Sequence, residues 1–364
     1  MHVISRLLLA CVAWALLSGV PVRAEPTLDA VKKRGQLICG VNGELPGFSF
    51  INAVKEWEGL DVDLCRAVAA AVLGDATKVK FVPLKPAERF TTLRSGGVDM
   101  LASNSTMTLQ RETDGLEFAV PNYYDGQGFV VPKKLGMKNL TDLRSGKVCV
   151  LKATTHQANM NAWFGARRLL VTPVEFDSQD EMYDAFLASR CIGVTQDSTA
   201  LASSLVRRGK TADYMMLPEI ISKEPLGPYV RRGDEAWLDV VRWTQYAMLQ
   251  AEELGIARGT VSHFLQSDDP KVRRILGDIP RTSSSPEDRM RSNDPAVQRL
   301  LGVTPGNGKA LGLDEAWAYW IITQVGNYGE SYEQNLGSRS PLKFARGLNA
   351  LWTQGGLMYP LPLR

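Results

Sequence analysis

The chain lacks a strong excess of charge of either sign. Its 364 residues hold 42 Lys and Arg against 39 Asp and Glu, for a formal net charge of +3 at pH 7. The basic pairs at 231–232 and 273–274 are short and typical of solvated surfaces. Nucleic-acid binding relies on a concentrated basic face. The composition therefore argues against a nucleic-acid partner.

Histidines and catalytic motifs are also scarce. Histidine occurs at only three positions, His2, His156 and His263. No nucleophile elbow, phosphate-binding loop or metal-ligand spacing such as Cys-x-x-Cys is present. We therefore expect no catalytic residue, no metal ion and no cofactor. An enzyme stays open as the main alternative, because His156 falls near a predicted cleft.

Beyond its first 24 residues the chain has no long apolar run. Residues 7–17 are almost continuously apolar, Arg6 precedes them, and 22–24 (Val-Arg-Ala) place small residues at the −3 and −1 positions of a cleavage site. A membrane-spanning helix needs about 20 apolar residues. We therefore expect 1–24 to be a cleaved signal peptide and not an anchor, with a soluble mature chain that begins near Glu25.

Cysteines are few, and their number is even once residues 1–24 are removed. Loss of Cys11 leaves Cys39, Cys65, Cys149 and Cys191. In an exported chain an even number of cysteines predicts two disulfides. A metal site is the alternative, but no spacing favours it. Four cysteines allow three pairings, and the spacing alone does not choose among them.

Short β-rich runs alternate with helical periodicity over most of the chain. The first set comprises strands at 36–41, 79–84 and 98–102 and helices at 61–73 and 87–95. The pattern restarts with strands at 146–151, 171–176 and 191–196 and helices at 155–164, 179–188 and 199–207. Asp61 is the expected N-cap of its helix. Such alternation predicts two α/β units, each with a parallel sheet flanked by helices.

Two extended segments connect these units. Residues 120–132 (VPNYYDGQGFVVP) lead out of the first unit, and 219–230 return to it. Paired crossing strands predict a hinge between two lobes. We expect lobe 1 to comprise 25–125 and 226–364, with a C-terminal helical extension, and lobe 2 to comprise 126–225. Further helices are expected at 235–253, 313–325 and 341–352, and a polar surface loop at 281–292.

Three polar clusters follow predicted strands, where ligands bind in open α/β folds. Arg111 lies in the segment that follows strand 98–102 and could grip a carboxylate through two parallel hydrogen bonds. Thr154 and Thr155 open a helix whose free N–H groups favour an anion. Asp197 ends a strand and could accept an ammonium group. A solvated arginine and ordinary helix caps are the plain alternatives, but together the clusters describe a site for an α-amino acid.

Several segments then resemble a known family. The run 59–64 (GLDVDL), the helix of Arg89, and the segments 108–111, 153–155 and 196–197 fall in matching order and separation. They resemble the polar amino-acid-binding proteins of ABC importers, solute-binding protein family 3, which have the type II periplasmic binding fold. The segments NYYDGQGFVVPKKLG, EPLGPYVRRGD, VGNYGESYEQN and ARGLNALWTQGGL resemble more narrowly the subgroup that binds L-amino acids in general.

The resemblance implies a monomeric periplasmic protein that captures L-amino acids, mainly polar ones, and delivers them to an inner-membrane ABC permease. Arg111 would clamp the α-carboxylate and Asp197 would accept the α-amine. The other ligand contacts it implies are Asn42, Arg89, Asn104, Thr106, Thr154 and Thr155. A periplasmic enzyme on the same fold, similar to cyclohexadienyl dehydratase, is the alternative. A protein that feeds a receptor and a paralogue without a ligand also stay open.

The chain departs from the subgroup's pattern beside the pocket. Ser103 and Met107 stand where the subgroup usually has an arginine and a tryptophan, and Ala153 stands where it has a glycine. These changes leave the side-chain specificity open.

The predicted hinge also limits how the cysteines can pair, because a disulfide across the cleft would oppose the hinge motion. We therefore expect pairing within the lobes, Cys39 with Cys65 and Cys149 with Cys191.

Overall fold

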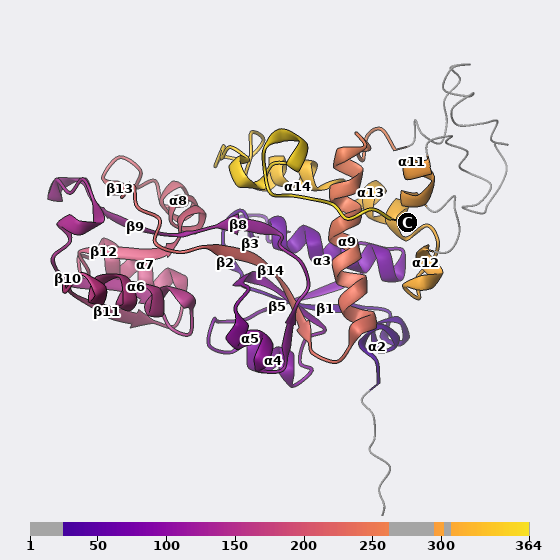
Figure 1. Cartoon of the computed structure of the whole chain (residues 1–364), viewed down its shortest axis with the longest axis horizontal. Helices are drawn as coiled ribbons and strands as arrows, with labels where there is room; N and C mark the ends of the chain where they lie inside the picture. The colour runs from indigo at the N-terminus through magenta and orange to yellow at the C-terminus, as the bar shows by residue number, and fades with distance from the viewer. Residues whose placement is uncertain (1–24, 262–294, 302–306, 364) are drawn as a thin grey trace, which may run out of the picture.

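The structure is a computed structural model that describes residues 25–261, 295–301 and 307–363. Figure 1 shows two α/β units joined by two crossing segments, with the C-terminal helices against one of them. The expected signal peptide (1–24) and polar loop (281–292) lie outside the described residues. Within the described ranges, no helix is both long enough and apolar enough to cross a membrane.

The first sheet combines strands from two separate parts of the chain. Its order is β5 (Val79–Pro83), β1 (Leu37–Val41), β6 (Met100–Thr106), β14 (Glu224–Arg231) and β7 (Leu116–Phe118), and β8 (Tyr123–Asp125) also pairs with β14. β1 runs parallel to β5 and β6, as the alternating pattern predicts. β14 returns antiparallel to β6, β7 and β8. A small sheet of β2 (Glu44–Leu45), β3 (Ser49–Ile51) and β4 (Trp57–Glu58) follows β1.

The second sheet is built from the middle of the chain. Its order is β11 (Leu170–Phe176), β10 (Ser145–Leu151), β12 (Gly193–Asp197), β9 (Gln127–Pro132) and β13 (Tyr214–Met216). Helix α6 (Thr155–Ala166) contributes Met160 and Phe164 to one apolar cluster. Helices α7 (Gln179–Leu187) and α8 (Ser198–Arg207) contribute Phe186 and Leu201 to another. The apolar residues of the sheet are thus divided between two cores.

The chain passes between the sheets twice. It leaves the first sheet after β8 and enters the second at β9, with Gly126 between them, and it returns between β13 and β14. A Cβ at Gly126 would lie 2.2 Å from Ile220 Cγ2 and 2.8 Å from the Ser222 carbonyl oxygen. Glycine is therefore needed because the two crossings touch. The two-stranded connection is as predicted, while the lobe limits at 125 and 225 stay a prediction.

The C-terminal helices enlarge the core of the first unit. Helix α3 (Leu60–Leu73) packs against α9 (Glu235–Glu253), α13 (Trp317–Gln324) and α14 (Tyr328–Asn335), with Trp237 and Trp317 fully buried. The other α-helices are α2 (Thr27–Arg34), α4 (Arg89–Arg94), α5 (Leu109–Thr113), α11 (Pro295–Leu300) and α12 (Asn307–Ala310). Short 3-10 helices are η1 (Lys133–Leu135), η2 (Leu140–Asp142), η3 (Gly347–Asn349) and η4 (Trp352–Gln354).

Three local predictions are wrong. Gly59, not Asp61, is the N-cap residue of α3, and the Asp61 carboxylate inside the first turn instead accepts a hydrogen bond from Asn104 N. Strand β6 extends to Thr106, because β14 pairs with its last residues. Residues 341–352 form no α-helix: Gly347 has a positive φ of 51° there, and only η3 and the first residue of η4 interrupt the irregular chain.

Two disulfides tie sheet strands to neighbouring segments. Cys39 on β1 is bonded to Cys65 on α3, and Cys149 on β10 is bonded to Cys191, just before β12. Each bond stays within one sheet and its helices. This is the pairing expected from the hinge.

Candidate functional site

The candidate site is a small cavity where the two units meet. Its volume is about 20 Å³, enough for about one water molecule. The ends of β6, β10 and β12 lie at its wall, through Thr106, Leu151 and Asp197. The lining residues that we predicted as ligand contacts are Asn42, Arg89, Asn104, Thr106, Thr154, Thr155 and Asp197. The wall also contains Leu45, Pro86, Ser103, His156 and Gln196.

Arg111, the predicted carboxylate clamp, is not part of this wall. Its Nη1 donates to the Thr106 carbonyl oxygen, and its guanidinium lies over the Phe90 ring at 4.6 Å from the centroid. Burial lowers the pKa of Arg111, and nearby Tyr229 and Glu224 oppose that shift. The arginine, on α5, is therefore near the cavity but turned toward the end of β6.

Arg89, and not Arg111, brings a guanidinium to the wall. The residue is buried, Nη1 donates to the Ser103 carbonyl oxygen at 2.8 Å, and Nε has no hydrogen-bond partner among the described residues. Burial lowers the pKa of Arg89 to about 9, and repulsion from Arg111 adds to the effect. A buried cation with a free N–H is suited to hold a ligand carboxylate.

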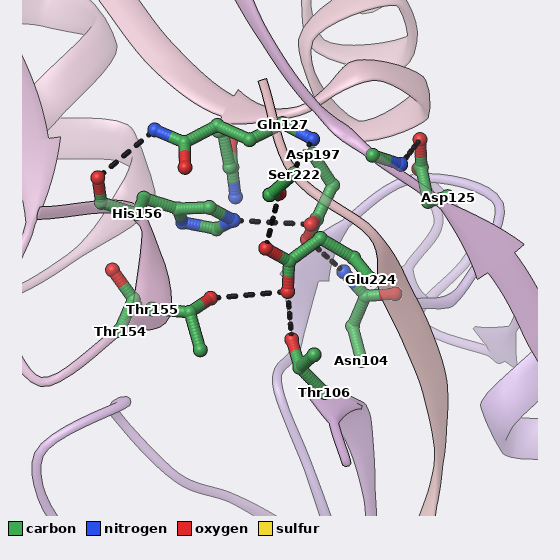
Figure 2. A network of polar contacts seen from close by, with 12 residues as sticks. Asn104, Thr106, Asp125, Gln127, Thr154, Thr155, His156, Asp197, Ser222 and Glu224 are labelled. Atoms are coloured by element: carbon green, nitrogen blue, oxygen red, sulfur yellow. Dashed lines mark hydrogen bonds and ion pairs between the residues drawn. The ribbon is translucent and has the colours of Figure 1, made fainter. Parts of the chain in front are cut away.

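Asp197 lies at the centre of the polar network in Figure 2. One of its oxygens lies 3.0 Å from His156 Nε2, and the other accepts from Asn104 Nδ2 at 2.8 Å. Burial opposes a charge on His156, but the Asp197 carboxylate, with a smaller contribution from Glu224, raises the pKa of the imidazole. Asn104 comes from the first unit and Asp197 from the second. Asp197, the predicted acceptor of the ligand amine, is therefore hydrogen-bonded across the cleft.

Thr154, Thr155 and Asn42 differ in their hydrogen-bond partners. Thr155 Oγ1 donates to the Glu224 carboxylate at 3.1 Å, whereas Thr154 Oγ1 donates to the Leu151 carbonyl oxygen and makes no helix cap. Asn42 Oδ1 accepts from the backbone N of Glu44 at 2.9 Å. All three face the cavity, yet each side chain is engaged within the protein.

Glu224, at the start of β14, is a residue that sequence reasoning missed. It is 1% exposed, and four side chains donate to its carboxylate. Oε2 accepts from Thr106 and Thr155, and Oε1 accepts from Asn159 and Ser222. Figure 2 shows it between the threonines of the two units. The only available signal was the acid that begins the crossing segment EPLGPYV.

Several polar atoms of the wall have no described partner. They are Arg89 Nε, Ser103 Oγ, Asn104 Oδ1 and His156 Nδ1. A buried polar group without a hydrogen bond costs about 1–3 kcal/mol. Such atoms gathered at one cavity are typical of a site that binds a polar molecule. No group of His, Cys, Asp and Glu suited to a metal ion occurs in the part of the chain that the structure describes.

Comparison with known proteins agrees with this geometry. Residues 37–258 match the sequence profile of the bacterial extracellular solute-binding proteins, family 3. The chain belongs to this family. It is 42% identical to the general L-amino acid-binding periplasmic protein AapJ of Rhizobium johnstonii, over 99% of each chain. It is 44% identical to the glutamate/glutamine/aspartate/asparagine-binding protein BztA of Rhodobacter capsulatus, over 96% of each.

Solved structures of solute-binding proteins show the same fold. An ABC transporter periplasmic binding protein from Brucella ovis with glutathione bound matches with a TM-score of 0.82 and 45% identity, over 93% of this chain and all of that one. The predicted α/β fold of two lobes with a two-strand hinge is therefore confirmed. The curated relatives are named as binding proteins and not as enzymes, so this chain is a solute-binding protein and the dehydratase alternative loses support.

Proposed function

We propose that this solute-binding protein captures polar L-amino acids in the periplasm and delivers them to an ABC permease. The observation that carries the proposal is the pairing of opposite charges at one cavity. Arg89, with Arg111 nearby, suits an α-carboxylate, and Asp197 suits an α-ammonium group. The names of the two bacterial relatives support the ligand class, and the name of AapJ supports the periplasmic location. Export then relies on a cleaved signal peptide at 1–24.

Binding would also drive closure. The cavity wall takes Arg89 and Asn104 from the first unit and Thr155 and Asp197 from the second. A ligand that contacts both units stabilises the closed state over the open one, which is the condition for a ligand-driven shift. The closed form is the one that a permease would recognise.

A thermal-shift screen against the twenty amino acids and glutathione tests the proposal. Glutathione belongs in the screen because the Brucella ovis protein was solved with it. We expect polar amino acids to raise the melting temperature of the wild type. Asp197→Ala should remove every shift, because loss of one partner of a buried charge pair costs about 2–5 kcal/mol.

Asp213→Ala is the matched control, because Asp213 is exposed and away from the cavity. It should bind as the wild type does. A wild type that none of these compounds stabilises, or one that chemically converts an amino acid, would contradict the proposal.

A further inference from the structure

Carboxylates outnumber guanidinium groups around the cavity. Arg89 and Arg111 are the cations, and the acids that interact with them or with one another are Asp61, Asp125, Asp197 and Glu224. Burial raises the pKa of Asp61 and of Asp125 to about 6, so both are largely ionised at pH 7.5. His156 adds at most one positive charge. The surroundings of the cavity are therefore negative at that pH.

Glu224 is an acid of this group that contacts residues of the cavity wall from both units. It lies directly behind Thr106 and Thr155, which line the cavity from the two units. Asn159 and Ser222 hold its other oxygen at 2.9 Å and 2.5 Å. Four donors thus fix the carboxylate, and the hydroxyls of Thr106 and Thr155 lie between it and the cavity. Figure 2 shows its contacts with Thr106, Thr155 and Ser222.

The same contacts fix what the threonines present to a ligand. A hydroxyl has one hydrogen to donate and two lone pairs that accept. The hydrogens of Thr106 Oγ1 and Thr155 Oγ1 are directed to Glu224. Only their lone pairs are left for the cavity, so they suit an N–H donor of a ligand and not a carboxylate oxygen.

We propose that Glu224 is a specificity-determining residue that makes the cleft prefer amino acids with amide or cationic side chains to those with acidic ones. This inference rests on the proposed function. A zwitterion is neutral, and its charges pair with Arg89 and Asp197. An acidic side chain would add a second negative charge to surroundings that already have an excess of negative charge. Its oxygens need hydrogen-bond donors, but the hydroxyls of Thr106 and Thr155 present only acceptors.

The test compares ligands that differ only in this feature. Titration calorimetry at pH 7.5 and constant ionic strength would measure Kd for glutamine against glutamate and for asparagine against aspartate. We expect the wild type to bind each amide at least about tenfold more tightly than its acid, because like charges in a binding site are strongly unfavourable. In Glu224→Gln this preference should fall about tenfold, with a gain in affinity for the acids.

Two further variants separate charge from folding. Glu224→Asp keeps the charge and should keep the preference for amides. Glu219→Gln is the matched control, because Glu219 lies on the same return segment but bonds to Leu140 N in the second unit, and its ratio should equal that of the wild type. Melting curves without ligand would show whether each variant is folded.

The failures are distinguishable. A wild type that prefers the acids, or an unchanged ratio in Glu224→Gln, overturns the role of Glu224 while the proposed function stands. Loss of the preference in Glu224→Asp also overturns it. A wild type that binds no amino acid at all overturns the proposed function, and the inference with it.

Discussion

His156 stands beside the carboxylate that we assign to the ligand amine, and its charge depends on pH. The imidazole is buried, with Nε2 at 3.0 Å from Asp197. Burial disfavours the imidazolium, but the charge and hydrogen bond of Asp197, together with the charge of Glu224, raise the pKa of His156 above its ordinary 6.5. The folded protein therefore holds this proton more tightly than the unfolded chain does.

This linkage predicts how stability changes with pH. The stabilisation from His156 is complete below pH 6.5 and is lost as the pH rises through the folded pKa. The free energy of unfolding of the wild type should therefore fall above pH 6.5 relative to that of His156→Gln. Urea titrations from pH 5.5 to 9 would measure the difference.

The shifts at Asp61 and Asp125 do not enter this comparison. Their raised pKa values of about 6 make stability fall as the pH rises from about 4 to 6. The wild type and His156→Gln share this effect. Parallel curves for wild type and His156→Gln above pH 6.5 would show that Asp197 does not hold the proton on His156.

Residue spacing located most of the site but not its side-chain directions. Arg111 does follow its N-cap Thr108, yet Phe90 and Tyr229, which come from other elements, set where its guanidinium lies. Glu224 could not be found because its role depends on two threonines 118 and 69 residues away in sequence. At Ala153 the sequence departure has a structural meaning. Its φ of 55° is a value that favours glycine.

At the scale of elements, the first turn of α7 is hydrogen-bonded across the cleft, in addition to its own N-cap Ser178. The backbone N of Gln179, its first residue, donates to Glu44 Oε2 at 2.8 Å, and that of Asp180 lies at 3.3 Å from the same oxygen. Glu44 belongs to β2 of the small sheet in the first unit. Gln179 also accepts from Gln196 Nε2 at 2.9 Å, and Gln196 lines the cavity. A chain of hydrogen bonds thus runs from the first unit through α7 to a residue of the cavity wall.

Glu44→Ala should weaken every ligand by about the same factor, roughly three- to tenfold, because a lost hydrogen bond costs about 0.5–1.5 kcal/mol net. The ranking of ligands should not change, since Glu44 does not line the cavity. Calorimetry with several amino acids would measure both. Glu56→Ala, at an exposed turn of the same small sheet, is the control. A changed ranking would mean that Glu44 touches the ligand.

Element boundaries were predictable where the pattern is local. Helix α9 matches its predicted range of 235–253, since its apolar face and its N-cap Asp234 lie within the segment. The end of β6 was not predictable, because it depends on β14, more than a hundred residues later. The pattern of 341–352 predicts a helix. Instead, Asn349 accepts a hydrogen bond from the backbone N–H of Tyr124 and donates one to its carbonyl oxygen, at the start of the crossing segment.

The whole molecule combines two rigid units with a hinge that must move, and each disulfide lies within one of the units. The bonds Cys39–Cys65 and Cys149–Cys191 span 26 and 42 residues of sequence. Loop-closure entropy alone assigns about 3–4 kcal/mol to each. Neither bond joins the two sheets, so each stabilises one unit without restricting the crossings near Gly126.

Stability and ligand affinity should therefore respond separately to loss of a disulfide. In Cys149→Ser/Cys191→Ser the free energy of unfolding should fall by about 3–4 kcal/mol, while Kd for an amino acid changes less than about twofold, because the folded units still close on the same side chains. Urea titration and calorimetry would measure the two quantities on the same preparation, with Cys39→Ser/Cys65→Ser as the comparison in the first unit. A loss of affinity as large as the loss of stability would instead mean that the Cys149–Cys191 bond positions β10 and β12, whose ends carry Leu151 and Asp197, for the ligand.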